Sequence, residues 1–276
     1  MTDRDRIDGF LRDGWVDVHS HVLPRVDDGA RDARESLEML RVAAADGMRV
    51  IAATPHASRC SREQIIEGVE RLNALAAAEG IEITVVAGSE VRLNAGVPEW
   101  YRAGRFATLN NTDYLLVELP LRGEWPSYVD QAIYDLQLAG ALPVLAHAER
   151  YPAVQEQPSI LTGLIATGVL IQINANSLRD DFGRSARDTA ETLIQAHLAH
   201  LIASDSHRAD SRPPRIRAAI ERAAELAGAE YAGWMADAAA AVVRGAAITL
   251  PEPDPSIDRP WSSSWLRRRL KRLPGA

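Results

Sequence analysis

The chain has 276 residues, of which 46% are hydrophobic and 25% charged, a composition typical of a soluble globular protein and unlike that of disordered or fibrous chains. Its net charge of −7 argues against a protein whose main task is to bind nucleic acid, and a single cysteine excludes an internal disulfide, which fits the reducing cytoplasm. No apolar run reaches the roughly 18 residues that span a bilayer, and the charged N-terminus lacks the apolar core of a secretory signal.

Short apolar runs alternate with longer amphipathic stretches along most of the chain. Seven runs have the length and the Val, Ile and Leu content of buried parallel strands: 15–18, 49–53, 82–87, 114–119, 142–146, 169–173 and 200–203. Helical patterns lie between them and after the last of them, at 32–45, 61–78, 127–139, 160–167, 188–197, 214–226 and 234–243.

Strands that alternate with helices in this way predict βαβ units, and hence an α/β fold with a parallel sheet. An open doubly wound sheet and a closed barrel both satisfy the pattern. The glycine-rich phosphate loops of nucleotide-binding sheets are missing from the sequence, which favours a TIM-like barrel. We expect a single catalytic domain at 15–250, an N-terminal extension at 1–14, and a proline-rich linker with a basic tail at 251–276.

The scarcity of lysine narrows the chemistry that such a barrel could perform. Lys271, close to the C-terminus, is the only lysine in the chain. Schiff-base catalysis needs a buried lysine, and so does a metal pair bridged by a carbamylated lysine. Lys271 is a poor candidate for either role, so we exclude both.

Metal-ligand side chains stand at the ends of six of the seven predicted strands. In chain order they are Asp17, His19, His21, Asp27 and Asp28 with the first strand, His56 with the second, Glu90 with the third, Glu118 with the fourth, His147 and Glu149 with the fifth, and Asp205 and His207 with the seventh. The carboxyl ends of parallel barrel strands open on one face, where barrel enzymes place their chemistry. Residues far apart in the sequence are therefore expected to converge there.

The spacing of these residues has a direct physical meaning. Residues i and i+2 of a strand point to the same side, so His19 and His21 can bind one ion together, and so can Asp205 and His207. A lone histidine is more often structural. His200 stands at the start of its strand, away from the predicted site, and we assign it a structural role.

The candidate ligands are imidazoles and carboxylates, without a thiolate. This set suits Mn²⁺, Fe²⁺ or Zn²⁺ and disfavours a structural zinc of the cysteine type. The candidates are too many for one ion. We expect two to three divalent metals that share a bridging carboxylate, with manganese preferred over iron or zinc.

These motifs resemble those of a known superfamily. They are Asp17-x-His19-x-His21, Asp27-Asp28-Gly29, Thr54-Pro55-His56, Gly88-Ser89-Glu90, His147-x-Glu149-Arg150-Tyr151 and Ser204-Asp205-x-His207. Together they are similar to the polymerase and histidinol phosphatase (PHP) superfamily, and within it to the bacterial CpsB/CapC-type protein-tyrosine phosphatases of capsule and exopolysaccharide systems. The resemblance covers residues 16–248 and implies a distorted (βα)7 barrel.

The resemblance also implies a ligand set. One metal would be held by His19, His21, Glu90 and Asp205, a second by Glu90, Glu118 and His147, and a third by Asp28, His56 and His207. The strand-end pattern alone leaves Asp27 and Asp28 both open, and the resemblance selects Asp28. We expect catalytic roles for Asp205, His207 and Arg150, with the guanidinium of Arg150 clamping a phosphoryl oxygen.

The implied function is that of a metal-dependent phosphomonoesterase. The expected substrate is a phosphotyrosine protein, namely the tail of a bacterial tyrosine kinase that governs capsule or exopolysaccharide production. A cysteine-dependent phosphatase requires an arginine six residues after its cysteine, whereas Ile66 follows Cys60 at that distance. Two alternatives remain open: a PHP-type phosphatase of histidinol phosphate or nucleotides, and a metal-binding regulator without activity.

The last residues of the chain suggest a separate contact. In 265–273, tryptophan and leucine alternate with arginine and lysine, which predicts a short basic amphipathic helix. Such a helix suits an anionic membrane surface or an acidic partner. The alternative is a solvated charged end. The sequence leaves the oligomeric state open.

Overall fold

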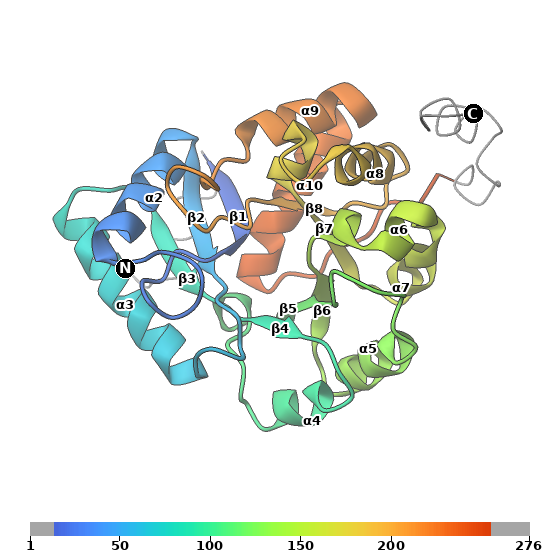
Figure 1. Cartoon of the computed structure of the whole chain (residues 1–276), viewed down its shortest axis with the longest axis horizontal. Helices are drawn as coiled ribbons and strands as arrows, with labels where there is room; N and C mark the ends of the chain where they lie inside the picture. The colour runs from blue at the N-terminus through green and yellow to red at the C-terminus, as the bar shows by residue number, and fades with distance from the viewer. Residues whose placement is uncertain (1–13, 255–276) are drawn as a thin grey trace, which may run out of the picture.

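All strand pairs are parallel in the computed structural model, which describes residues 14–254. One sheet contains β1 (Trp15–Ser20), β2 (Met48–Ala53) and β3 (Thr84–Ala87), in that order. The second contains, in order, β4 (Glu90–Arg92), β5 (Tyr114–Glu118), β6 (Leu142–Leu145), β7 (Leu170–Asn174) and β8 (Leu201–Ala203). The predicted α/β class with parallel sheets is therefore confirmed (Figure 1).

The two sheets are linked at two places, both next to predicted ligands. Isolated parallel bridges join Ser20 to Ser206 and His56 to Glu90. At the first bridge the backbone N–H of His21 donates to the carbonyl of Ser206 at 2.8 Å. These links hold the ends of strands from different sheets close to one another.

The third predicted strand forms β3, and after a division at Gly88 and Ser89 a strand that was not predicted, β4, follows it, which accounts for eight strands in the described chain where seven were expected. After β3 the chain follows the segment beyond β2, because the N–H of Gly88 donates to Ala53 at 2.9 Å and that of Glu90 donates to Pro55 at 3.1 Å. Glycine is required at position 88, since a Cβ there would lie 2.8 Å from the Thr54 side chain. The division places Glu90 at the start of β4, between the two sheets.

The helices follow the predicted order with shifted ends. They are α2 (Ala33–Ala45), α3 (Arg62–Ala78), α4 (Val97–Arg102), α5 (Val129–Leu138), α6 (Pro152–Glu156), α7 (Thr162–Ala166), α8 (Arg184–Gln195), α9 (Arg217–Ala227) and α10 (Ala229–Arg244). The short helices α4 and α6 were not predicted, and α7 is preceded by a 3-10 turn at Pro158–Leu161. Helix α10 begins five residues before the predicted start, directly after Gly228.

Local sequence signals explain where two of the long helices begin. The side chain of Asp32 accepts the N–H of Glu35 and so caps α2. Ser61 and Gln64 form a reciprocal capping box at the start of α3. These caps satisfy N–H groups that have no partner within the helix.

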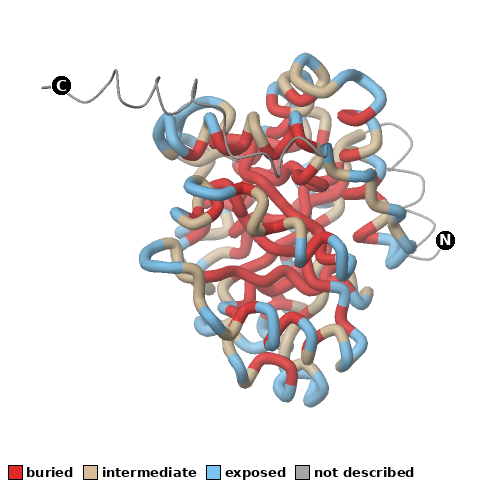
Figure 2. The backbone as a smooth tube through the Cα atoms, turned by 90° about the vertical axis from the view of Figure 1, so that its right-hand side faces the viewer, coloured by how far each residue is buried: buried red, intermediate tan, exposed pale blue. Residues whose placement is uncertain are grey.

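The apolar core has two layers. In the inner cluster, alternate residues of seven strands pack with one another and with α10; examples are Val16 and Val18 of β1 and Val242 of α10. The other residues of these strands pack against the surrounding helices in a larger cluster. Buried backbone therefore runs through the centre of the molecule and exposed residues lie around it (Figure 2). Most of the buried polar residues lie at or after the carboxyl ends of the strands.

Residues 14–254 include no helix with the length and apolarity that a membrane crossing requires. The predicted extension at 1–14 lies outside the described residues apart from Gly14, and so does the basic tail after residue 254. Within the described part of the linker, the N–H of Asp254 donates to the carbonyl of Ala196 at 3.0 Å.

Candidate metal centre

The structure brings all nine predicted ligands into one cluster, which is buried except at His56 and Asp28. They are His19 in β1, His21 and Asp28 after β1, His56 after β2, Glu90 at the start of β4, Glu118 at the end of β5, His147 after β6, and Asp205 and His207 after β8. Three overlapping groups of these side chains have ligand atoms within 4.8 Å of one another. The convergence expected from the strand ends is thus present, with Glu90 displaced onto a strand of its own.

Glu90 lies at the centre of the cluster. Its Oε1 is 2.9 Å from Nε2 of His147 and 3.5 Å from Nε2 of His19. Its Oε2 is 2.8 Å from Nδ1 of His56 and 3.5 Å from Nε2 of His21. A carboxylate in contact with four imidazoles through both oxygens has the geometry of a bridging ligand.

Glu118 contacts two of the histidines that also contact Glu90. Its Oε1 lies 3.7 Å from Nδ1 of His56, and its Oε2 lies 3.9 Å from Nε2 of His147. On the outer side, Nε of Arg92 donates to Oε1 of Glu118 at 3.0 Å. One face of this carboxylate therefore meets the histidines and the other meets an exposed guanidinium.

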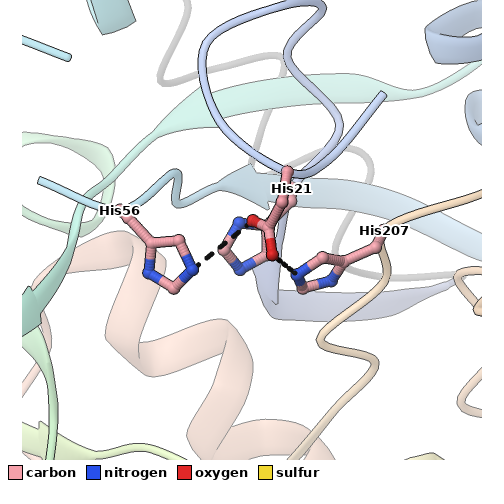
Figure 3. Close-up of side chains that lie close together, drawn as sticks. His21, His56 and His207 are labelled. Atoms are coloured by element: carbon pink, nitrogen blue, oxygen red, sulfur yellow. Dashed lines mark ion pairs between the residues drawn. The ribbon is translucent and has the colours of Figure 1, made fainter. Parts of the chain in front are cut away.

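A second group of ligands lies at the more exposed side. His21 lies between His56 and His207, with ring centroids 4.8 Å and 4.0 Å away (Figure 3). Asp28 spans the outer two, since its oxygens lie 3.5 Å from Nε2 of His56 and 3.5 Å from Nε2 of His207. Asp28 is 66% exposed, so an ion held here would be open to substrate.

Asp27 and Asp28 have different positions, although the sequence pattern alone did not separate them. Oδ2 of Asp27 is 2.7 Å from Nδ1 of His21, on the side of the ring away from Glu90. Its two oxygens also accept the N–H groups of His56 and Gly29. Asp27 thus orients a ligand, whereas Asp28 faces the candidate site.

Asp205 lies between the histidines and a pair of arginines. Its Oδ1 is 3.5 Å from Nε2 of both His19 and His21. Its Oδ2 is 3.2 Å from Arg150 and 2.7 Å from Arg212. Arg150 is therefore placed beside the cluster as predicted, and Arg212 is a second cation at the same carboxylate.

Phe182 supports both arginines. The guanidinium carbon of Arg150 lies 4.2 Å from the centroid of the Phe182 ring, and that of Arg212 lies 5.3 Å from it. An aromatic face attracts a cation electrostatically. The ring therefore holds two positive charges at the edge of the metal cluster, where a phosphate dianion would approach. A single phenylalanine in a loop gives no sequence signal for this role.

Two amide side chains of β7 connect several ligands. Oε1 of Gln172 lies 3.1 Å from Nδ1 of His19 and accepts the N–H of His147 at 3.0 Å. Nε2 of Gln172 donates to Oδ1 of Asn174 at 2.9 Å, and Nδ2 of Asn174 donates to Oδ2 of Asp205 at 2.8 Å. We call Gln172 and Asn174 the amide relay. Its sequence signal was the polar Gln172 within an otherwise apolar strand, and the sequence analysis did not use it.

Glu149 holds the backbone of Asn174, the second residue of the amide relay. This fully buried carboxylate accepts the hydroxyl of Ser177 at 2.5 Å and the backbone N–H of Asn174 at 3.2 Å. Although its residue type suits a metal, its hydrogen bonds go to Ser177 and Asn174 rather than to the candidate ligands. Its position indicates a structural role.

The backbone is strained at two of the candidate ligands. His147 has φ 37° and Asp205 has φ 48°, a left-handed conformation that residues with a Cβ seldom adopt. Such strain persists only where the surroundings enforce it, and it is concentrated at functional sites. Here it turns both side chains towards the cluster directly after their strands end.

Charge interactions within the cluster displace several pKa values. Burial would lower the pKa of His21, but its hydrogen bonds to Asp27 and Glu90 raise it to about 10. Burial raises the pKa of Glu118, and the neighbouring Glu90 carboxylate raises it further. Burial would raise the pKa of Asp205, yet the positive charges of His19 and Arg212 hold it well below its usual range. The buried carboxylates therefore require nearby positive charge.

Divalent cations fit this arrangement. Nε2 of His19 and Nε2 of His21 are buried without a hydrogen-bond partner, and both face the oxygens of Glu90 and Asp205. Buried polar atoms of this kind are rare unless a ligand engages them. The donors are nitrogen and oxygen atoms, which suits manganese, iron or zinc. Burial and the charge of His21 lower the pKa of the His207 imidazole to about 4.

His200 lies apart from the cluster. Its Nδ1 accepts the backbone N–H of Ile171 at 3.0 Å, and its ring contacts Trp234 edge-on at 5.9 Å. The side chain is fully buried, and burial lowers its pKa to about 3. A neutral histidine packed against α10 agrees with the structural role expected from the sequence.

Comparison with known proteins identifies the family of the chain. The family described as capsular polysaccharide synthesis, CpsB/CapC, matches residues 15–243. The tyrosine-protein phosphatase YwqE of Bacillus subtilis is 34% identical over 87% of this chain and 96% of its own length. The tyrosine-protein phosphatase CpsB of Streptococcus agalactiae is 28% identical over 72% of this chain and 85% of its own length.

A solved structure extends the similarity to the fold. It comes from the crystal structures of YwqE from Bacillus subtilis and CpsB from Streptococcus pneumoniae, which are described as unique metal-dependent tyrosine phosphatases. The TM-score is 0.83 at 34% identity, over 87% of this chain and 98% of the other. An amidohydrolase from Mycoplasma synoviae matches with a TM-score of 0.53 at 10% identity, which shows likeness of fold alone.

Proposed function

The chain belongs to the CpsB/CapC capsular polysaccharide synthesis family, and on this basis we propose that it is a metal-dependent protein-tyrosine phosphatase. The observation that carries the proposal is the contact of Glu90 with four imidazoles inside a cluster of nine nitrogen and oxygen ligands. Metal clusters with a bridging carboxylate suit phosphate ester hydrolysis, because several cations can share the charge of one phosphoryl group.

The nine clustered residues would hold two to three divalent ions, with manganese preferred and iron or zinc as alternatives. His19, His21, Glu90 and Asp205 would hold one ion, Glu90, Glu118 and His147 a second, and Asp28, His56 and His207 a third. When bound, these ions would neutralise phosphoryl oxygens and make water a stronger nucleophile.

The protein's own residues would bind and orient the phosphate. Arg150 and Arg212 lie side by side over Phe182, so their guanidinium groups are placed to engage phosphoryl oxygens. Asp205 and His207 would act at the reacting phosphate together with Arg150. A tyrosinate leaving group has an ordinary pKa of about 10 and needs less protonation than a serine alkoxide.

The proposed biological substrate is the phosphotyrosine tail of a tyrosine kinase that governs capsule or exopolysaccharide production in the cytoplasm. We further propose that the two sheets form one distorted (βα)7 barrel within a single catalytic domain at 15–250. The links at Ser20–Ser206 and His56–Glu90, and the inner core shared by seven strands, support that assignment. The tail after residue 250 would add a contact with a membrane or an acidic partner.

Hydrolysis kinetics test this function. The Mn²⁺-loaded protein is compared on a phosphotyrosine peptide, the matched phosphoserine peptide and histidinol phosphate. We expect the highest kcat/KM on phosphotyrosine and loss of all activity after chelation. Faster hydrolysis of histidinol phosphate would instead identify a small-molecule phosphatase, and no turnover of any ester would identify a metal-binding regulator.

A further inference from the structure

A pocket of about 540 Å³ opens beside the metal centre. It lies between the loop at 57–63, the end of β4 with its following turn at 91–94, and the segment around α4 at 100–106. We call it the α4 pocket. Its volume lies within the range of about 300–1,000 Å³ that is usual for ligand sites. None of its lining residues belongs to the candidate metal ligands.

The inner wall of the α4 pocket is also the wall of the metal centre. Ala57, which follows His56, donates its N–H to the carbonyl of Glu90 at 2.9 Å. Arg92 lines the pocket and donates to Glu118 at 3.0 Å. The metal cluster and the pocket are therefore separated only by the two segments that carry His56 and Glu90.

The charge of the α4 pocket is positive. Arg62, Arg92 and Arg105 line it, and Glu63 is its one carboxylate. Arg62 is the first residue of α3, so the positive end of that helix dipole lies at the same place. In a protein with a net charge of −7, this is a local excess of cations.

The rest of the wall is aromatic and neutral. Trp100 is 37% exposed, and the guanidinium of Arg105 lies 6.0 Å from the centroid of its ring. Phe106 also lines the pocket. Cations above an aromatic surface favour a ligand with carboxylates on a partly apolar chain.

We propose that the α4 pocket binds acidic residues that flank phosphotyrosine in the substrate polypeptide. The inference rests on the proposed phosphatase function and names a determinant of its specificity. An extended peptide advances about 3.3 Å per residue, so residues close to phosphotyrosine in the sequence could reach the adjoining pocket while the phosphate lies at the metals. Charge complementarity selects acidic side chains for that position.

The test uses phosphotyrosine peptides that carry either Asp and Glu or their amides Asn and Gln at the four positions before or after phosphotyrosine. The pocket variant is Arg62→Ala with Arg105→Ala. The control is Arg71→Ala with Arg102→Ala, which removes the same charge from α3 and α4 at positions outside the pocket. All proteins are loaded with Mn²⁺ and also assayed on p-nitrophenyl phosphate, which has no flanking residues.

We expect the unmodified protein to prefer the acidic peptides by about tenfold in kcat/KM, as two partly exposed ion pairs would give. The pocket variant should lose this preference through a higher KM, whereas the control should keep it. All three proteins should hydrolyse p-nitrophenyl phosphate equally. An equal preference in the pocket variant and the control would overturn the proposal, as would no preference in the unmodified protein.

Binding without turnover separates this proposal from the function on which it rests. The same peptide pairs with a non-hydrolysable phosphonate in place of the phosphate are titrated by fluorescence anisotropy. Tighter binding of acidic peptides that depends on Arg62 and Arg105 would support the pocket even if no ester were hydrolysed. If phosphotyrosine were hydrolysed but the acidic and amide peptides bound equally well, the phosphatase function would stand and the proposed role of the α4 pocket would be rejected.

Discussion

Oε1 of Gln172 lies 3.1 Å from Nδ1 of His19, and this contact fixes which nitrogen of the imidazole is free to bind an ion. Because the amide oxygen can only accept a hydrogen bond, the ring carries a proton on Nδ1, and Nε2, which faces Glu90 and Asp205, is the nitrogen available to an ion. The same oxygen accepts the N–H of His147. One neutral side chain on β7 thus positions two candidate ligands from different strands.

Replacement of Gln172 by leucine should therefore weaken metal binding without removing a ligand. The variant leaves the buried Nδ1 of His19 and the N–H of His147 without their acceptor, and changes of this kind typically cost about 10- to 100-fold in metal affinity. The measurement is a Mn²⁺ titration by calorimetry. Gln137→Leu is the control, because that amide donates to Thr167 on the outer surface. Equal Mn²⁺ affinity in both variants would rule out a positioning role for Gln172.

Metal stoichiometry should distinguish the ligands of a trinuclear centre. Glu90→Gln should remove about two Mn²⁺ ions per chain, because the proposed assignment gives this carboxylate to two of them. Asp28→Asn should remove about one Mn²⁺ ion per chain. Asp27→Asn should lower the affinity for Mn²⁺ without removing a particular ion, since Asp27 only orients His21. Elemental analysis of Mn²⁺-saturated protein measures these numbers. A single ion in the unmodified protein would contradict the trinuclear assignment.

The positions at the ends of the predicted strands indicated the candidate ligands, because the carboxyl ends of parallel strands in a barrel-like fold lie on the same face. That reasoning needs only the periodicity of the sequence. It could not show that Glu90 would begin a separate strand, because the division depends on how the backbone at Gly88 fits between Ala53 and Leu109. Packing of this kind is decided by tertiary contacts, which a local pattern does not contain.

The residues that hold the candidate ligands in place were harder to predict from the sequence, for a different reason. Phe182 lies in a loop, and nothing in its local sequence separates it from other surface side chains. Gln172 and Asn174 did leave a signal, since polar residues two apart in a buried strand require hydrogen-bond partners. The partners themselves, His19 and Asp205, became evident only from the structure.

Cys60 should be dispensable for catalysis. Its thiol is half-buried, its pKa is raised to about 11 by burial, and its sulfur lies 3.8 Å from the carbonyl of His56. A thiol of this kind is a poor nucleophile at neutral pH. We expect Cys60→Ser to keep kcat on p-nitrophenyl phosphate within about twofold, while Asp205→Asn lowers it by about 100-fold or more through loss of a ligand. A folded but inactive Cys60→Ser protein would restore the thiol mechanism.

His200 should make the stability of the metal-free protein sensitive to acid. Its pKa is about 3 in the folded chain and about 6.5 in an unfolded one, so the unfolded state binds the extra proton between these values. The stabilising contribution is therefore complete above about pH 6.5 and decreases as the pH falls. Between pH 7 and pH 5, protonation of His200 in the unfolded chain should lower the free energy of unfolding by about 2 kcal/mol, since one pKa unit corresponds to about 1.4 kcal/mol.

The variant that tests this prediction is His200→Asn, whose side-chain oxygen can still accept the N–H of Ile171 but does not titrate. Urea unfolding of both chelated proteins at several pH values from 7 to 5 gives the two stability curves. The substitution will lower stability at pH 7, because the smaller side chain leaves space beside Trp234. The slope with pH is the informative quantity, and it should be shallower in the variant by the contribution of one histidine. Parallel curves would mean that His200 takes up a proton as readily in the folded chain as in the unfolded one.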